Sequence, residues 1–202
     1  MAGLRDRKKQ QTHDALSQAA IGLFLERGFD EVSVADIAAA ADVSKPTLFK
    51  YFATKQDLAL HRISDHEHEA ARVVRASAAS PIEALRDHFL AGLERRDPVT
   101  GLNDHPEVLA YYRLIFMTPA LATRLYQFIA ADQTALAEAL TEAGDDDLEA
   151  ELTAAQLIST QQVLSRRNWL ALSTGTSADA QYAKAVDEAT RAYGRLTTRV
   201  EL

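Results

Sequence analysis

Between Ser33 and Phe52 the chain reads SVADIAAAADVSKPTLFKYF, in which two short helix-forming stretches are separated by a tight turn. Ser33, followed three residues later by Asp36, is a capping-box-like start for the first helix, with Asp in place of the usual Glu. Ser44 can cap the second helix, and Pro46 falls in its first turn, where a missing backbone N–H costs nothing. Two short helices joined in this way have the spacing of a helix-turn-helix motif.

The second helix of this motif carries the side chains that point to a nucleic-acid partner. Recognition helices reach base edges in the major groove with their N-terminal residues, while flanking hydroxyls and lysines hold phosphates. The outer face of the helix displays Lys45, Thr47, Lys50 and Tyr51. These residues predict an interface for double-stranded DNA, since the basic-aromatic platform typical of RNA binding is absent from the sequence.

The net charge of −7 would by itself argue against a DNA partner, but the charge is unevenly distributed. The first 60 residues carry eight basic and eight acidic side chains, so the whole acidic excess lies in residues 61–202. Within the neutral part, Val43–Gln56 has three lysines and no acid, and Arg5–Lys9 is a second basic cluster. DNA binding requires a basic face and not a basic total.

Length and composition narrow the class of protein. The chain has 202 residues, enough for one domain or for a small domain fused to a larger one. The absence of cysteine excludes disulfides, thiolate zinc sites and cysteine nucleophiles. No stretch approaches the roughly 20 apolar residues of a membrane span, and residues 1–9 are not followed by an apolar signal core. We therefore expect a cytoplasmic protein with no membrane partner.

Alanine occurs 37 times, against 13 for glycine and proline together. Alanine is the best helix former, and glycine and proline are the helix breakers, so we expect an all-α fold of about nine helices. A three-helix N-terminal domain would precede a helical body. The expected helices span about 4–27, 33–41, 44–52, 54–79, 80–96, 106–118, 119–143, 145–173 and 177–202.

The N-terminal pattern resembles a known family. It consists of Ala19-Ala20-x-x-Leu23-Phe24-x-x-x-Gly28-Phe29, then Ser33-Val34-x-x-Ile37-Ala38, then Val43-Ser44-Lys45-Pro46-Thr47-Leu48-Phe49-x-Tyr51-Phe52-x-x-Lys55-x-x-Leu58. Over residues 9–60 this looks like the DNA-binding domain of the TetR family of transcriptional regulators. Position 46 is often Gly in the family and is Pro here, and Phe49 stands where the family often has Tyr. Both differences can change which operator is read.

The resemblance implies a role for each residue of the motif. Serine hydroxyls at helix starts would bind phosphate, the start of the second helix would reach bases, and the lysines and tyrosine would clamp the backbone. Arg5–Lys9 would lie over a neighbouring phosphate or groove. The predicted DNA-binding residues are Ser33, Ser44, Lys45, Pro46, Thr47, Lys50, Tyr51 and Lys55. The aromatic residues expected in the domain's core are Phe24, Phe29, Phe49 and Phe52.

The last two helices carry apolar rows that predict a dimer. In the final helix Tyr182, Val186, Ala189, Tyr193, Leu196 and Val200 are spaced 4, 3, 4, 3 and 4 residues apart, an a/d pattern. The helix before it has two apolar rows: Leu148, Leu152 and Ala155, and Leu157, Leu164 and Ala171. The resemblance implies a homodimer held by a four-helix bundle of these helices, with Tyr182, Val186, Ala189, Tyr193 and Leu196 at its interface. The alternative is that both faces pack within one chain.

The middle of the chain mixes aromatic and polar residues. The resemblance implies a small-molecule pocket inside the helical body, and such pockets are mostly apolar with a few placed polar groups. The predicted pocket residues are Phe89, Tyr112, Arg113, Phe116 and Trp169. Aromatic residues at helical spacing equally suit a plain core. We divide the chain into a DNA-binding domain, residues 1–54 with its motif at about 33–52, and a ligand-binding and dimerisation domain, residues 55–202.

Two other classes of protein are disfavoured. His61, Asp65 and His68 share a face of the expected helix 54–79, but there is no HExxH motif and the alternating charges are typical of an exposed face. GxSxG, P-loop and GxGxxG motifs are absent, so we predict no enzyme, no cofactor and no metal. The resemblance implies a ligand-responsive repressor that binds a palindromic operator as a homodimer and is released by a small-molecule effector. The alternative is a helical interaction or small-molecule-binding module that has lost operator binding.

Overall fold

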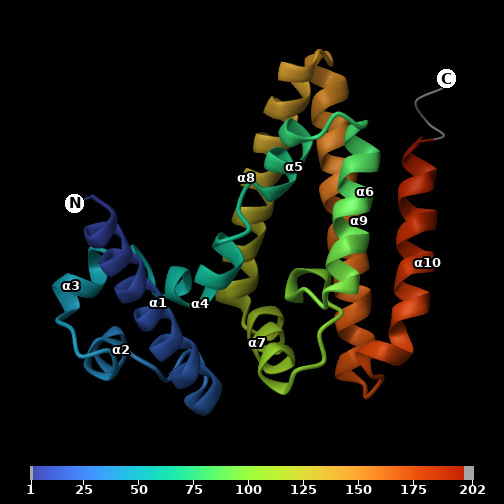
Figure 1. Cartoon of the computed structure of the whole chain (residues 1–202). Coiled ribbons are helices and arrows are strands. Elements are labelled where there is room, and N and C mark those ends of the chain that lie inside the picture. Colours follow the sequence, from blue (N-terminus) through green and yellow to red (C-terminus); the bar gives the residue numbers. More distant parts are fainter. Residues whose placement is uncertain (1, 198–202) are drawn as a thin grey trace. The chain divides into compact units, whose positions relative to one another are not determined.

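A computed structural model describes residues 2–197, except for the side chains of residues 2, 4–6, 8 and 9. Within that part all regular structure is helical, with no strand, which confirms the all-α prediction (Figure 1). The helices are α1 Ala2–Arg27, α2 Val34–Ala40, α3 Lys45–Phe49, α4 Lys55–Ser64, α5 Glu69–Ala76, α6 Pro81–Glu94, the 3-10 turn η1 Pro98–Thr100, α7 Pro106–Met117, α8 Pro119–Ala143, α9 Asp147–Ser173 and α10 Ala178–Thr197.

The helix expected over residues 54–79 is wrong in one respect, because it is broken in two. α4 ends at Ser64 and α5 begins at Glu69, with His68 in a left-handed conformation between them (φ 60°). The backbone N–H of His68 donates to Asp132 Oδ1 at 2.7 Å. Because that acceptor lies 64 residues further along the chain, no pattern in the neighbouring sequence predicts the break.

The chain forms two compact units, each built from two segments. The first contains the residues up to Asp65 together with Ala110–Tyr126, and the second contains His66–Leu109 together with the residues from Gln127 onward. The unit boundary near residue 65 coincides with the break between α4 and α5. The predicted functional division after residue 54 stays a prediction.

The core of the first unit fixes the N-terminal helices on one another. Its residues are apolar side chains of α1 to α4, of the segments between these helices and of the α8 start, all less than a tenth exposed: Leu16, Ala20, Phe24, Phe29, Val32, Ile37, Ala38, Leu48, Phe52, Leu58, Ala59 and Leu121. The Tyr111 hydroxyl of α7 donates to the Ala59 carbonyl of α4 at 2.8 Å. Burial of this phenol raises its pKa far above the usual range, so it remains a neutral donor.

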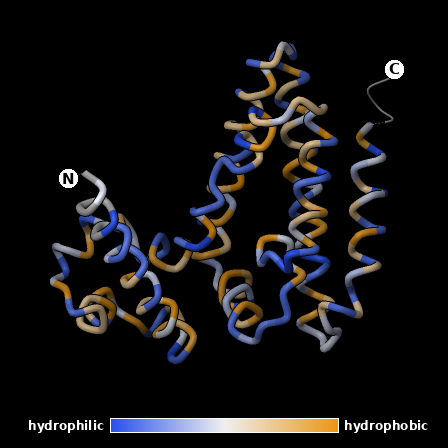
Figure 2. Tube along the Cα trace, in the orientation of Figure 1, coloured by the Kyte–Doolittle hydropathy of each residue, from blue (hydrophilic) through white to orange (hydrophobic). Residues whose placement is uncertain are grey.

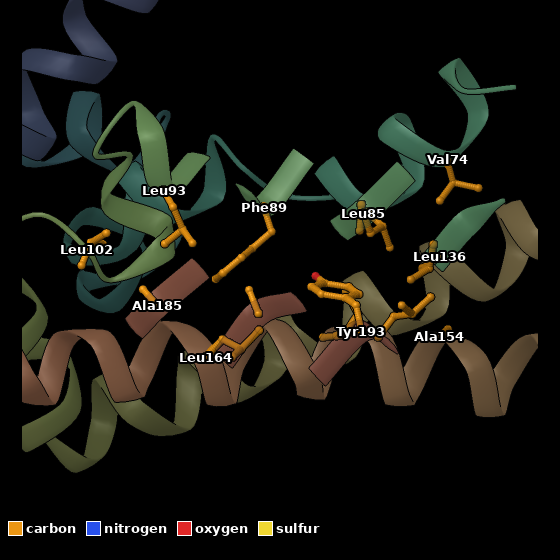
Figure 3. Packing of buried hydrophobic residues seen from close by; sticks show 14 of the residues in the cluster. Val74, Leu85, Phe89, Leu93, Leu102, Leu136, Ala154, Leu164, Ala185 and Tyr193 are labelled. Carbon is orange, nitrogen blue, oxygen red and sulfur yellow. The ribbon is translucent and has the colours of Figure 1, made fainter. Parts of the chain in front are cut away.

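The second unit is held together by long amphipathic helices. Figure 2 shows hydrophobic and hydrophilic residues intermixed along α6, α9 and α10, as expected when one stripe of each helix is buried. α10 packs against both α6 and α9. In Figure 3, Phe89 of α6 lies near Tyr193 of α10, with their ring centres 6.4 Å apart.

Among the described residues, no single helix is long and apolar enough to cross a membrane. Only α7 and α8 together reach that length and composition, and they are bent by 93° at the break between them.

The turn after η1 yields a stability prediction. Gly101 has φ 71°, and a Cβ added there would overlap the backbone carbonyl of Ser165 in α9. Gly101→Ala should therefore combine a left-handed alanine with a backbone clash and lower the free energy of unfolding by about 3 kcal/mol or more. Urea denaturation followed by circular dichroism measures this change.

Gly22→Ala is the matched control. Gly22 lies in α1, and nothing stands within 4 Å of the position that its Cβ would take. The substitution should be neutral or should stabilise the protein by up to about 1 kcal/mol, since alanine favours the helix. Equal unfolding curves for the two variants would contradict the packing described for Gly101.

Candidate nucleic-acid interface

The two helix starts of the predicted motif are capped as the sequence indicates. Ser33 Oγ accepts from the Asp36 N–H at 3.2 Å, and the Asp36 carboxylate accepts from the Ser33 N–H at 2.8 Å, which completes a capping box at α2. These bonds from Ser33 hold the pKa of Asp36 below its usual range. At α3, Ser44 Oγ accepts from the Thr47 N–H at 3.2 Å, and Pro46 lies in the first turn. Both caps confirm the predicted helix starts.

The turn between α2 and α3 is tight and buried on one side. Asp42 adopts a left-handed conformation (φ 52°), which aspartate tolerates better than most residues. The Val43 N–H then donates to the Ala38 carbonyl at 2.9 Å. Leu48, the buried residue of α3, contacts the core formed with α1 and α4. The inner face of the motif is therefore packed against the core, and its outer face, the front of the motif, is open to solvent.

The front of the motif presents most of the predicted DNA-binding side chains to solvent. The exposed members are Ser33, Ser44, Lys45, Pro46 and Lys50, and the half-buried members are Thr47, Tyr51 and Lys55. The Thr47 hydroxyl lies 2.8 Å from Ser44 Oγ, so the two hydroxyls occupy the same first turn. Among the basic residues of Arg5–Lys9, only the side chain of Arg7 is described, and it is exposed. The predicted roles of Arg5, Lys8 and Lys9 fall outside the described side chains.

Lys55 differs from the other two lysines in its surroundings. Its Nζ lies 4.2 Å from the ring centre of Phe29 and 5.7 Å from that of Phe24. The ammonium group therefore makes a cation–π contact with the core of its own unit. A phosphate contact by Lys55 would have to be made from this position.

The prediction that Phe49 belongs to the core is wrong. Phe49 is 52% exposed, whereas Phe24, Phe29 and Phe52 are buried as predicted. Since Leu48 points inward, the next residue on so short a helix is rotated to the outer side. The signal that could have identified Phe49 as a surface residue is its position directly after the buried leucine.

The predicted pocket residues fall in different compact units. Phe89 and Trp169 are buried in the second unit, and Phe89 packs beside Tyr193. The remaining three belong to α7 in the first unit, where the rings of Tyr112 and Phe116 lie 5.8 Å apart and Arg113 is exposed. A single pocket lined by all five stays a prediction.

Two of the predicted dimer residues must be reassigned. Ala189 and Tyr193 are fully buried within the chain itself, because the a/d row of α10 faces α6 and α9. Tyr182, Val186 and Leu196 are half-buried against the same core. This is the alternative in which the row packs inside one chain, and it removes Ala189 and Tyr193 from any surface.

α9, by contrast, has one apolar row inside and one outside. Leu157 and Leu164 are buried, whereas the row that begins at Leu148 and Leu152 is exposed. Val163 and Leu170 continue the exposed row and are 58% and 43% exposed. Of the apolar rows predicted on the last two helices, the exposed one therefore lies on α9.

Comparison with known proteins places the helix-turn-helix in a family. Residues 16–61 match the family model described as bacterial regulatory proteins, tetR family. The HTH-type transcriptional regulator TcmR of Streptomyces glaucescens is 38% identical over 122 residues, which cover 59% of this chain and 54% of TcmR. The match spans a little over half the length of the curated relatives.

Solved structures share the fold over nearly the whole chain. Salmonella enterica GusR has a TM-score of 0.58 at 22% identity, over 95% of this chain and 96% of that one. NalD, described as the secondary repressor of the MexAB-OprM multidrug efflux pump in Pseudomonas aeruginosa, has a TM-score of 0.60 at 18% identity, over 92% and 96%. The helix-turn-helix segment, residues 16–61, therefore belongs to the tetR family of bacterial regulatory proteins.

The cap of α3 generates a prediction that separates its structural role from a binding role. Ser44→Ala should lower the free energy of unfolding by about 1 kcal/mol, because the Thr47 N–H loses its acceptor. Ser44→Asp should leave stability nearly unchanged, since aspartate caps helices as well as serine does. Urea denaturation of both variants checks this, and an equal loss in the two would show that capping is not what Ser44 supplies.

Proposed function

We propose that the protein is a transcriptional regulator that binds a double-stranded DNA operator through α2 and α3. The observation that carries this proposal is the exposed first turn of α3, which presents Lys45, Pro46 and Thr47 from a buried scaffold. Recognition helices use this part of the helix to reach base edges. The match of residues 16–61 to a family described as bacterial regulatory proteins supports the same function.

The residues divide by the kind of contact that their chemistry allows. Lys45 and Thr47 are placed to read base edges in the major groove. Lys50 and Tyr51, near the end of α3, hold the phosphate backbone, as do the hydroxyls of Ser33 and Ser44 and the ammonium of Lys55. Backbone contacts supply most of the affinity and base contacts most of the sequence discrimination. The function is one of binding in the cytoplasm and not of catalysis.

The operator is a palindrome and the protein acts on it as a homodimer. A single helix-turn-helix contacts few bases, and high specific affinity generally requires two half-sites. The exposed apolar row Leu148, Leu152, Val163 and Leu170 on α9 supports this, since the last three residues are separated by 11 and 7 positions and so share one face. Beside Val163, a groove of about 270 Å³ between α9 and α10 is lined by Arg167, Arg191 and Arg195.

The regulator acts as a repressor that a small-molecule effector releases. The candidate ligand contacts are Phe89 and Trp169 in one unit and Tyr112, Arg113 and Phe116 in the other. An effector that binds better to the form unable to hold the operator must weaken DNA binding by the same factor. A coupling free energy of 1–3 kcal/mol would change operator affinity roughly 5–150-fold. NalD, which shares the fold, is described as a repressor.

Variants of α3 test operator binding. Lys50→Ala should weaken binding to every duplex alike, because it removes one phosphate contact. The slope of the logarithm of the affinity against the logarithm of the salt concentration should become shallower by about one. Thr47→Ala should instead relax the sequence preference at one or two positions. Fluorescence anisotropy with a selected duplex and its single-base variants, at two salt concentrations, measures both effects.

Lys184→Ala is the control for Lys50→Ala, because Lys184 is an equally charged, exposed lysine on α10 in the other compact unit. Its affinity for the duplex should equal that of the unaltered protein. If Lys184→Ala and Lys50→Ala weakened binding equally, the interface would not lie on α3, and a module without operator recognition would become the better description.

A substitution on α9 tests the dimer. Val163→Glu should be tolerated in the folded chain, because Arg167 and Arg195 line the same groove. In the proposed interface it would bury a carboxylate from each chain, so we expect monomers at micromolar concentration in sedimentation experiments. Leu25→Glu, which changes an exposed leucine of α1, should leave the dimer intact. A dimer that survives Val163→Glu would contradict this interface.

A further inference from the structure

Three side chains of the first unit converge on one point beside the helix-turn-helix. His13 and Asp14 lie on α1, and His61 lies on α4. His61 Nε2 is 3.0 Å from His13 Nδ1 and 3.2 Å from Asp14 Oδ1, and the three ligand atoms all lie within 4.8 Å of one another. His61 is 5% exposed, so the cluster is closed on its inner side.

Hydrogen bonding alone leaves this cluster short of protons. The Asp14 carboxylate is an acceptor only, and its Oδ1 also accepts from Gln10 Nε2 at 2.9 Å, so Gln10 supplies a proton to Asp14 but none to the contacts at His61 Nε2. Each of the two contacts at His61 Nε2 needs a proton, but only one proton can lie there. A proton on His61 Nε2 is shared between His13 and Asp14, whereas a proton on His13 Nδ1 that is donated to His61 leaves none for the contact with Asp14. A single cation at this point would satisfy all three lone pairs.

The two imidazoles are held in place by groups outside the cluster. The His13 ring stacks on Phe52, with the ring centres 4.1 Å apart and the planes 21° from parallel. The other nitrogen of His61, Nδ1, lies 3.5 Å from Ser64 Oγ and 3.8 Å from Asp65 Oδ1. Metal-binding histidines usually hydrogen-bond through their second ring nitrogen to a group outside the metal site, and Ser64 Oγ is such a group for His61 Nδ1.

We propose that His13 Nδ1, Asp14 Oδ1 and His61 Nε2 form a binding site for a divalent transition-metal ion of the zinc type. Tetrahedral zinc with bonds of 2.0–2.1 Å to nitrogen and oxygen places its ligand atoms about 3.3 Å apart, so the distances of 3.0 Å and 3.2 Å from His61 Nε2 to the other two ligand atoms are within a few tenths of an ångström of this value. Two imidazoles and one carboxylate suit zinc and its neighbours, whereas magnesium and calcium prefer oxygen ligands alone. The fourth position is left to water or a ligand from outside.

The site would link α1 to α4 and, through the ring of Phe52 that stacks on His13, to the segment that follows α3. Binding to the folded form only would raise its stability in proportion to the logarithm of the metal concentration. In the sequence only His61, Asp65 and His68 suggested a metal, which the lack of an HExxH motif and the alternating charges disfavoured, and the break after Ser64 takes His68 off that helix face. The two ligands that the sequence did not indicate lie 47 and 48 residues before His61.

A second histidine cluster provides a matched control. In the other unit His66 Nδ1 lies 2.8 Å from Glu69 Oε2, and His88 Nε2 lies 3.5 Å from Glu69 Oε1. Each imidazole faces its own carboxylate oxygen, so the lone pairs do not meet at one point. The hydrogen bonds from both histidines hold the pKa of Glu69 far below its usual range, as expected of a carboxylate that is already satisfied.

Calorimetric titration of the tag-free, chelator-treated full chain with zinc chloride tests the proposal. We expect one zinc ion per chain, no binding of magnesium, and visible absorption bands of tetrahedral nitrogen and oxygen coordination when cobalt replaces zinc. Asp14→Asn and His13→Gln should each weaken zinc binding at least 10-fold, because each removes a ligand. His88→Gln should bind zinc as the unaltered protein does.

Asp14→Asn keeps the shape of an exposed side chain, so its fold should survive, and circular dichroism verifies this. His61→Gln is not needed, since His61 is buried and its loss could unfold the unit. Absence of zinc binding by the unaltered chain would overturn the proposal. So would zinc binding by Asp14→Asn and His13→Gln that is as strong as that of the unaltered chain. The titration contains no DNA, so its failure would leave the proposed operator binding untouched.

Discussion

Burial of Leu48 in the core that it shares with α1, α2 and α4 is the interaction on which the proposed function depends. α3 has five residues, far too few to form a stable helix alone, since isolated helices shorter than about 12 residues are marginal in water. The cap from Ser44 and the buried leucine are what hold it in one conformation. The same packing that buries Leu48 turns Lys45, Pro46 and Lys50 outward. The position of the reading surface is thus a consequence of the core behind it.

The helix-turn-helix could be predicted in detail because its signals are local. Capping residues, a first-turn proline and a buried leucine act within four residues of one another, and the structure shows the caps at Ser33 and Ser44 as expected. The break between α4 and α5 could not be predicted in this way. It involves an acceptor on α8, Asp132, that only the folded chain brings to His68. The convergence of His13 with His61 was hidden for the same reason.

The long helices show the limit of periodicity as evidence. The row on α10 that includes Ala189 and Tyr193 has the spacing of an intermolecular seam, yet it is satisfied within the chain by α6 and α9. The spacing of apolar residues indicates that a helix face is buried, but it does not indicate whether the same chain or a second chain buries it. On α9 two rows were recognised, and only the structure shows that Leu157 and Leu164 are inside while Leu148 and Leu152 are outside.

Operator recognition by α3 is the central claim, and selection of binding sequences from random double-stranded DNA tests it most directly. The selected duplex would then be titrated with the protein at two salt concentrations. The account predicts that a palindrome is enriched and bound at nanomolar strength, with an affinity that falls steeply as salt rises. If no sequence is enriched and binding stays weak and uniform, α3 does not read an operator, and the claim is contradicted.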